Sequence, residues 1–182
     1  TIDLGGKTIT QDGAVNDYLL NFKNDGTKEN VITLKNGTIN AGTAAFCALA
    51  TASSNAQKMT INLENINLIN NNSTGAVVKF RGGAELNVKA GTVITGTDSY
   101  VGIEAVGNNT VVNVYDGAKI YQNGTSSYVG AIIGASYNAT LNIYGGEGKS
   151  AKCGIIVMST GATINVSGGE WTANGDGTVS ND

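Results

Sequence analysis

The chain contains no histidine and no proline, and Arg81 is the one arginine among its 182 residues. Histidine is the side chain that most readily exchanges protons near neutral pH, and it is the commonest metal ligand. The chain therefore lacks the residue most often used for proton transfer and for metal binding. Charged residues make up 14% of the chain and the net charge is -3, which leaves no basic surface for DNA or RNA. No apolar run approaches the ~18 residues of a membrane span. We therefore expect neither nucleic-acid binding nor membrane insertion.

Cysteine is also scarce, with Cys47 and Cys153 as the two copies. The repeat described below places them four coils apart, or ~19 Å at ~4.8 Å a coil. A disulfide needs Cα atoms within ~7 Å. The sequence therefore predicts two free thiols, and cysteine content gives no information on the cellular compartment.

A short pattern of two apolar residues around one other residue recurs through the chain. Its copies begin at residues 2, 32, 61, 86, 112, 141 and 164, which gives intervals of 23 to 30 residues: Ile2-Asp3-Leu4, Ile32-Thr33-Leu34, Ile61-Asn62-Leu63, Leu86-Asn87-Val88, Val112-Asn113-Val114, Leu141-Asn142-Ile143 and Ile164-Asn165-Val166. Turn residues follow the copies, and 26 glycines supply positive φ at corners. Such a period with extended segments predicts a solenoid whose coils stack strand on strand. Residues 15–22 fit a strand or one helical turn, and we favour the strand.

A second repeated strand starts at glycine in four places, Gly75, Gly102, Gly130 and Gly154. Because side chains alternate along a strand, two registers are open. We favour the one that sends Lys79 and Glu104 to solvent, since burying either charge would be costly. It predicts an inward set of Ala76, Val78, Ile103, Ala105, Ala131, Ile133, Ile155 and Val157. Its outward apolar residues would form an interface strip of Val77, Val106, Ile132, Ile156 and Met158.

The repeated strand, turn, strand, loop, strand unit resembles the right-handed parallel β-helix of pectin-lyase-like enzymes, phage tailspikes and bacterial surface adhesins. The opening Ile2-Asp3-Leu4-Gly5-Gly6-Lys7-Thr8-Ile9 is similar to the first coil of secreted bacterial proteins of this type. Coils of 23 to 30 residues are longer than those of the left-handed form. The resemblance implies an all-β, right-handed parallel β-helix solenoid of about seven coils, with residues 1–182 as one domain. It implies fold alone, because this fold carries unrelated functions.

Catalytic residues of the resembling enzymes have no clear counterpart here. Glycoside cleavage needs two facing carboxylates ~5 to ~9.5 Å apart, and Glu104 and Asp116 lie on different strands. Arg81 fits a coil corner better than a catalytic base. Residues 174–178 resemble a calcium loop but lack its terminal glutamate, so a turn is favoured. We expect no enzyme activity, no catalytic residue, no cofactor and no metal site.

One outward row is polar and regular: Asn62, Asn87, Asn113, Asn142 and Asn165 lie at equivalent positions of successive coils. Stacked asparagines form hydrogen bonds along the axis, so we predict a surface ladder with a structural role. The alternative, an ice-binding array of Thr-x-Asn, is weakened by Val31, Glu85 and Val111 in the threonine row.

The sequence as a whole favours an extracellular or cell-surface structural or adhesive module. Its expected partners are other copies of itself or flanking solenoid coils, with glycans as a further candidate. Neither end of the repeat shows a cap, so the chain is expected to stack end to end into a filament or to form part of a longer solenoid. The alternative is a carbohydrate-binding or polysaccharide-active β-helix.

Overall fold

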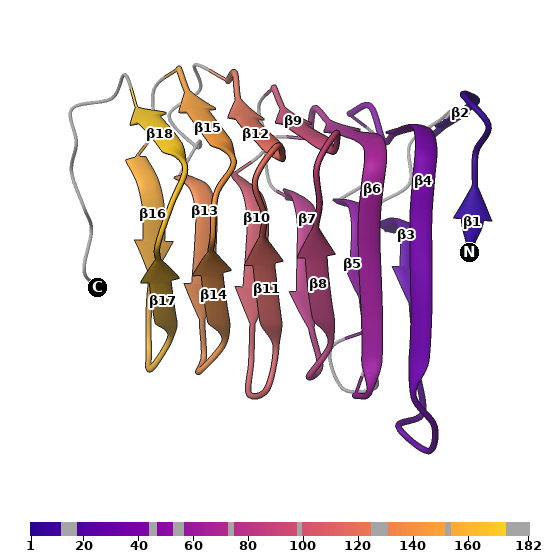
Figure 1. Ribbon diagram of the computed structural model, residues 1–182, viewed down its shortest axis with the longest axis horizontal. Coiled ribbons are helices and arrows are strands. Elements are labelled where there is room, and N and C mark those ends of the chain that lie inside the picture. Colours follow the sequence, from indigo (N-terminus) through magenta and orange to yellow (C-terminus); the bar gives the residue numbers. More distant parts are fainter. Residues whose placement is uncertain are drawn as a thin grey trace.

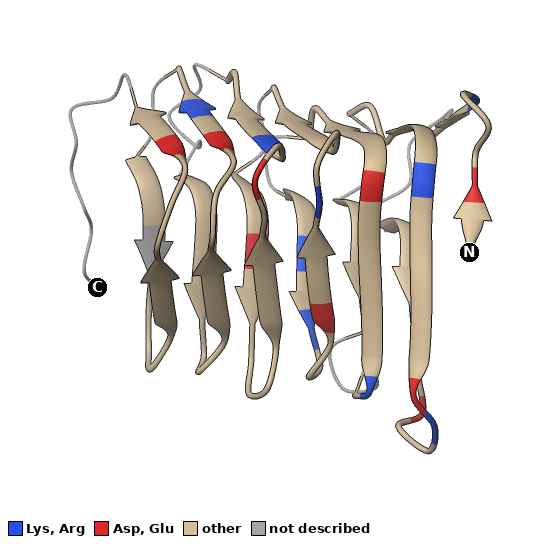
Figure 2. Ribbon diagram, in the orientation of Figure 1, with Lys and Arg blue, Asp and Glu red and all other residues tan. Residues whose placement is uncertain are grey.

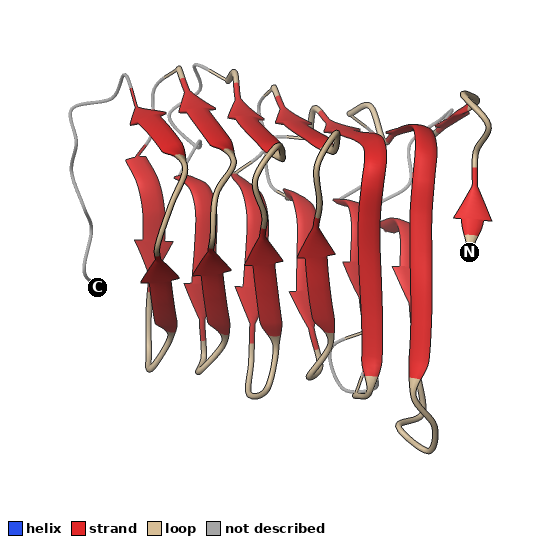
Figure 3. Cartoon of the chain, in the orientation of Figure 1, coloured by secondary structure: helices blue, strands red, loops and turns tan. Residues whose placement is uncertain are grey.

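A computed structural model describes residues 1–11, 18–43, 47–52, 57–72, 75–97, 100–124, 131–151 and 154–173. Within these ranges all regular structure is β-strand and there is no helix (Figure 3). The strands stack turn upon turn along the longest axis, with the N-terminus at one end and the last described strand near the other (Figure 1). The chain is a parallel β-solenoid, which confirms the predicted fold class.

Two parallel sheets form the walls of the solenoid. The first sheet contains β1 (Ile2–Asp3), β2 (Thr8–Thr10), β4 (Asn30–Asn40), β6 (Met59–Asn70), β8 (Glu85–Val88), β9 (Val93–Gly96), β11 (Val111–Val114), β12 (Lys119–Gln122), β14 (Thr140–Ile143), β15 (Glu147–Ser150), β17 (Thr163–Val166) and β18 (Glu170–Ala173). The second sheet contains β3 (Tyr18–Phe22), β5 (Cys47–Thr51), β7 (Ala76–Arg81), β10 (Val101–Val106), β13 (Ala131–Ser136) and β16 (Gly154–Met158). β3 shows that the favoured strand forms at residues 18–22, while residues 12–17 lie outside the described part.

The regular part of the solenoid, from β6 to β16, is about four turns long, whereas the sequence predicts about seven coils. Within it each repeat of the apolar pattern pairs with the next in the expected register, as Ile61 with Leu86 and Val112 with Leu141. The strands before β6 and after β16 extend the same two sheets.

The first strand departs from the predicted register by two residues. Ile2 pairs with Leu34 and Asp3 with Lys35, instead of with Ile32 and Thr33. The Lys35 ammonium lies 3.4 Å from the Asp3 carboxylate, and Asn36 donates to both carboxylate oxygens. These polar contacts stabilise the shifted register, which the apolar pattern alone does not predict.

The second sheet corrects the predicted inward and outward sets. Val78, Ile103, Ala105 and Ile133 lie in the core and Lys79 and Glu104 lie at the surface, as predicted. Val77 and Ile132 are also in the core, so their place in an outward strip is wrong.

The physical reason for this error is a break in strict alternation, since the successive residues Val77 and Val78 both pack inward. The glycines that begin the second repeated strand also do not occupy equivalent positions, because Val101 pairs with Ala76 and Ala131. Gly75 is therefore equivalent to Tyr100, and Gly102 falls two positions later than expected from Gly75. A side chain there would collide with the Ile132 carbonyl and with Ile120, so only glycine fits.

Candidate interaction surfaces

The asparagine row of the first sheet is a continuous hydrogen-bonded ladder. Each amide donates from Nδ2 to the Oδ1 of the asparagine one turn earlier: Asn87 to Asn62 at 3.1 Å, Asn113 to Asn87 at 2.9 Å, Asn142 to Asn113 at 2.8 Å and Asn165 to Asn142 at 2.8 Å. The strand pairings hold these residues opposite one another. The five residues are those that the sequence assigns to the ladder.

Neighbouring side chains partly cover the ladder in its middle. Asn87 and Asn113 are buried although they lie on the outer face of the sheet. The Tyr115 hydroxyl lies 3.4 Å from the Asn87 Oδ1, and Asn113 donates a second hydrogen bond to Glu85 at 3.2 Å. Amides that are covered and satisfied in this way hold the turns together, which favours the structural interpretation of the ladder.

A second axial row, one residue beyond the apolar pattern, alternates in charge and then becomes aromatic. Its members are Asp3, Lys35, Glu64, Lys89, Tyr115 and Tyr144. Ion pairs join Asp3 to Lys35 at 3.4 Å and Glu64 to Lys89 at 2.7 Å, and the two tyrosine rings stack at 5.3 Å. Figure 2 shows the opposite colours on adjacent turns. Sequence reasoning missed this row because it aligned Asp3 with Thr33.

The predicted apolar interface strip does not exist as a surface. Val77 and Ile132 are buried, and Ile156 is partly buried against the core. Val106, the last residue of β10, is partly exposed, and the side chain of Met158 lies outside the described part. The strip therefore offers no continuous apolar contact surface among its described members.

The last turn leaves open a core column that is closed elsewhere. Val88, Val114, Ile143 and Val166 follow one another in that column on successive strands. The first three are at most 1% exposed, whereas Val166 is 57% exposed. At the opposite end Ile2 pairs with the buried Leu34 and is 42% exposed. Both ends of the described solenoid thus present apolar side chains beside unpaired strand edges.

Trp171 covers the other half of the last turn. Its ring lies over Gly148, where a Cβ atom would be 2.0 Å from the ring, so the glycine leaves room for the indole. The Trp171 Nε1 is buried with no acceptor among the described residues. An acceptor contributed by something docked at this end would satisfy it.

Paired carboxylates of the kind that cleave glycosides have one candidate among the described residues. The structure places Glu147 and Glu170 opposite each other on β15 and β18, a juxtaposition that the sequence analysis did not identify. A hydrogen bond from Lys149 lowers the pKa of the Glu147 carboxyl, with the Lys149 and Lys119 charges adding to the effect. A general acid needs a raised pKa, so Glu147 is poorly suited to that role. The described residues contain no cluster of potential metal ligands.

Arg81 and Cys47 are held in structural positions on the second sheet. The Arg81 guanidinium donates to the Thr51 carbonyl and the Tyr18 hydroxyl, and it lies over the Tyr18 ring, as a corner residue would. Cys47 is a buried free thiol whose pKa is raised to about 12, chiefly by burial. Such a thiol is unreactive at neutral pH. Cys153 lies outside the described residues.

The described part of the chain has no helix that is long and apolar enough to cross a membrane. Comparison with protein-family models, with curated proteins and with solved structures finds no match.

Proposed function

We propose that the chain is a non-enzymatic, extracellular structural or adhesive β-solenoid module. The two ends of its solenoid would dock on the ends of other copies or on flanking solenoid coils. The observation that carries this proposal is the exposure of Ile2 and Val166, which are the two ends of one column whose other members are buried. Parallel strand edges with open hydrogen-bonding groups beside an apolar column favour the addition of another strand.

Register supports the stacking of copies in particular. Val166 ends a column that continues through Leu63 and Leu34 to Ile2 at the other end. Trp171 likewise ends the column that includes Ile120, Ile39 and Ile9. A second copy added in the same register would place Ile2 on Val166 and Ile9 on Trp171. The open ends are therefore complementary in residue type.

Light scattering over a range of protein concentrations tests this stacking. We expect the mass of the wild-type protein to rise with concentration, and Val166→Asp and Ile2→Asp to hold it at that of one chain. Tyr144→Asp is the matched control, because Tyr144 is 50% exposed but directly follows β14, which has β11 on one side and β17 on the other. A constant monomer mass for the wild type, or an equal loss of assembly in all three variants, would contradict stacking between copies.

The enzymatic alternative receives less support from the described residues. Glu104 is paired with Lys79 at 2.7 Å, and Glu147 is held ionised by Lys149. We expect no release of reducing ends or unsaturated products from polygalacturonate, alginate or neutral glycans. Product formation above the blank that is lost in Glu147→Gln or Glu170→Gln would overturn this part of the proposal.

A further inference from the structure

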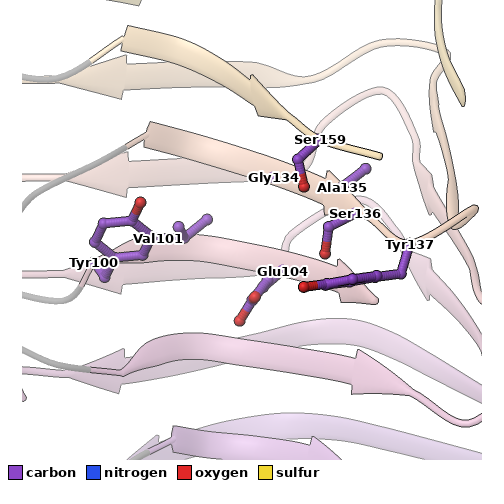
Figure 4. Close-up of a pocket in the computed structure, with 8 residues that line it drawn as sticks. All are labelled: Tyr100, Val101, Glu104, Gly134, Ala135, Ser136, Tyr137 and Ser159. Atoms are coloured by element: carbon purple, nitrogen blue, oxygen red, sulfur yellow. The ribbon is translucent and has the colours of Figure 1, made fainter. Parts of the chain in front are cut away.

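A small hollow lies on the outer face of the second sheet, over β10 and β13. It has a volume of about 210 Å³, and its polar lining consists of Tyr100, Glu104, Ser136, Tyr137 and Ser159. The Glu104 carboxylate projects between the rings of Tyr100 and Tyr137, and the two serines lie along one side (Figure 4). All of these residues belong to the described part of the chain.

The hollow exists because one position of the sheet lacks a side chain. Lys79, Glu104 and Gly134 occupy equivalent positions on β7, β10 and β13. The first two carry long side chains and Gly134 carries none, so a gap opens directly beside Glu104. Tyr100 stands at the start of β10 in the position that Gly75 has before β7, with its N–H donating to the Gly75 carbonyl. The second sheet thus combines a missing side chain with an added ring.

Tyr137 adds a second ring at a position of unfavourable backbone geometry. Its φ is +53°, a region that costs conformational energy in any residue with a side chain. The equivalent positions of the two preceding turns hold Gly82 and Gly107, and that of the following turn holds Thr160, all at positive φ. The Tyr137 side chain is 61% exposed, so little burial compensates for the strain. An exposed ring at a strained position motivates the hypothesis that the ring contacts a ligand.

The charges around the hollow restrict the ligand that it fits. Lys79 lies 2.7 Å from the Glu104 carboxylate, so the pair carries no net charge. The Lys79 charge opposes binding of a cation, and the Glu104 charge opposes binding of a uronate or another anion. Glu104 still has acceptor capacity beyond one partner, and the hydroxyls of Ser136 and Ser159 both donate and accept.

We propose that this hollow binds a neutral saccharide unit of a glycan. The apolar C–H face of a sugar ring would lie against Tyr137, and Tyr100 would close the opposite end of the hollow; these two residues are 61% and 46% exposed. Its hydroxyls would donate to Glu104 and exchange hydrogen bonds with the two serines. The hollow is smaller than the ~300 to ~1,000 Å³ of sites for drug-sized ligands, which fits one sugar ring at a chain end or branch. This inference rests on the hollow alone and not on stacking at the ends of the solenoid.

Calorimetric titration of the purified protein with a panel of neutral oligosaccharides tests the proposal, with galacturonate oligomers and choline as charged probes. We expect at least one neutral oligosaccharide to bind and neither charged probe to do so. Tyr137→Gly restores the glycine of the two preceding turns, so it should reduce affinity at least tenfold while leaving the melting temperature unchanged or raised. Tyr100→Gly should weaken binding similarly.

Tyr144→Ala is the matched control, because Tyr144 is about as exposed but lies at the end of β14 on the other sheet. It should leave the affinity unchanged. The titration should give the same result in the Val166→Asp background, where stacking between copies is disrupted, so failure of one proposal is distinguishable from failure of the other. No binding by any neutral oligosaccharide of the panel, preference for a charged probe, or equal losses in Tyr137→Gly and Tyr144→Ala would overturn the inference.

Discussion

The middle turns and the last turn of the solenoid use similar residues and reach different degrees of burial. Val114 on β11 and Val166 on β17 have the same side chain, the same column and the same position in their strands. The first is fully buried, because turns lie on both sides of it, while the second is 57% exposed. Burial in this fold therefore depends on the adjacent turns as well as on the pattern within a strand.

The last turn partly compensates for its missing neighbour. Trp171 occupies the column of Ile94 and Ile120, and its ring fills the space above Gly148. The large Trp171 ring beside Gly148, which has no side chain, provides the packing contacts that Ile94 and Ile120 provide in the middle turns. The comparison shows that one half of the last turn is closed and the half that contains Val166 is open.

The largest difference is expected when one substitution is made at both valines. Val114→Asp buries an unpaired carboxylate between two turns and should lower the free energy of unfolding by roughly 3 kcal/mol or more. Val166→Asp leaves its carboxylate in water and should change stability by about 0.5 kcal/mol or less. Chemical denaturation of a monomeric sample measures both. Equal losses would show that the end is covered in solution.

Trp171→Ala should have the next largest effect, because it uncovers the closed half of the last turn. We expect a loss of about 2 kcal/mol, below the ~3 to ~5 kcal/mol of a fully buried tryptophan, since Trp171 is only partly buried. Thermal and chemical unfolding measure it, with Thr172→Ala as a control on the same strand. A loss no greater than that of the control would contradict the covering role of the ring.

The asparagine ladder gives a smaller contrast between middle and end. Asn113→Ala removes bonds to Asn87 and Asn142 and leaves covered partners unsatisfied, which should cost about 1 to 3 kcal/mol. Asn165→Ala removes one ladder bond at an exposed position and should cost about 0.5 kcal/mol. Denaturation midpoints of the two variants compare them. Similar losses would show that position along the ladder does not matter.

The smallest effect is expected at Asp3, on the first strand. A hydrogen bond from the Gly5 N–H, then one from Asn36 and the Lys35 contacts, lower the pKa of its carboxyl below the usual 3.8. Because the folded pKa is the lower one, the stabilisation is present above pH 3.8 and is lost as pH falls through the folded value. Asp3→Asn should therefore lower the melting temperature slightly near pH 7 and not at about pH 2. A pH-independent difference would exclude this linkage.

Much of the solenoid can be predicted from the sequence, because the underlying signals are local and repeated. Apolar residues on either side of Asn62, Asn87 and Asn113 indicate strands with a buried face and a polar face. Their equal spacing within each copy predicts the ladder. The charges of Lys79 and Glu104 place these residues at the surface. Each of these inferences needs only the period of a strand and the cost of burying a polar group.

The tertiary structure decided what depends on matching one turn to another. The copies of the repeat are separated by unequal lengths, so the partner of Asp3 or Gly102 follows from the geometry of the intervening corners. Val77 is buried because two successive side chains turn inward, an exception that strand periodicity cannot anticipate. The hollow beside Gly134 and the open column at Val166 arise in the same way. A residue's own sequence neighbours determine its strand, whereas the turns stacked on it determine its environment.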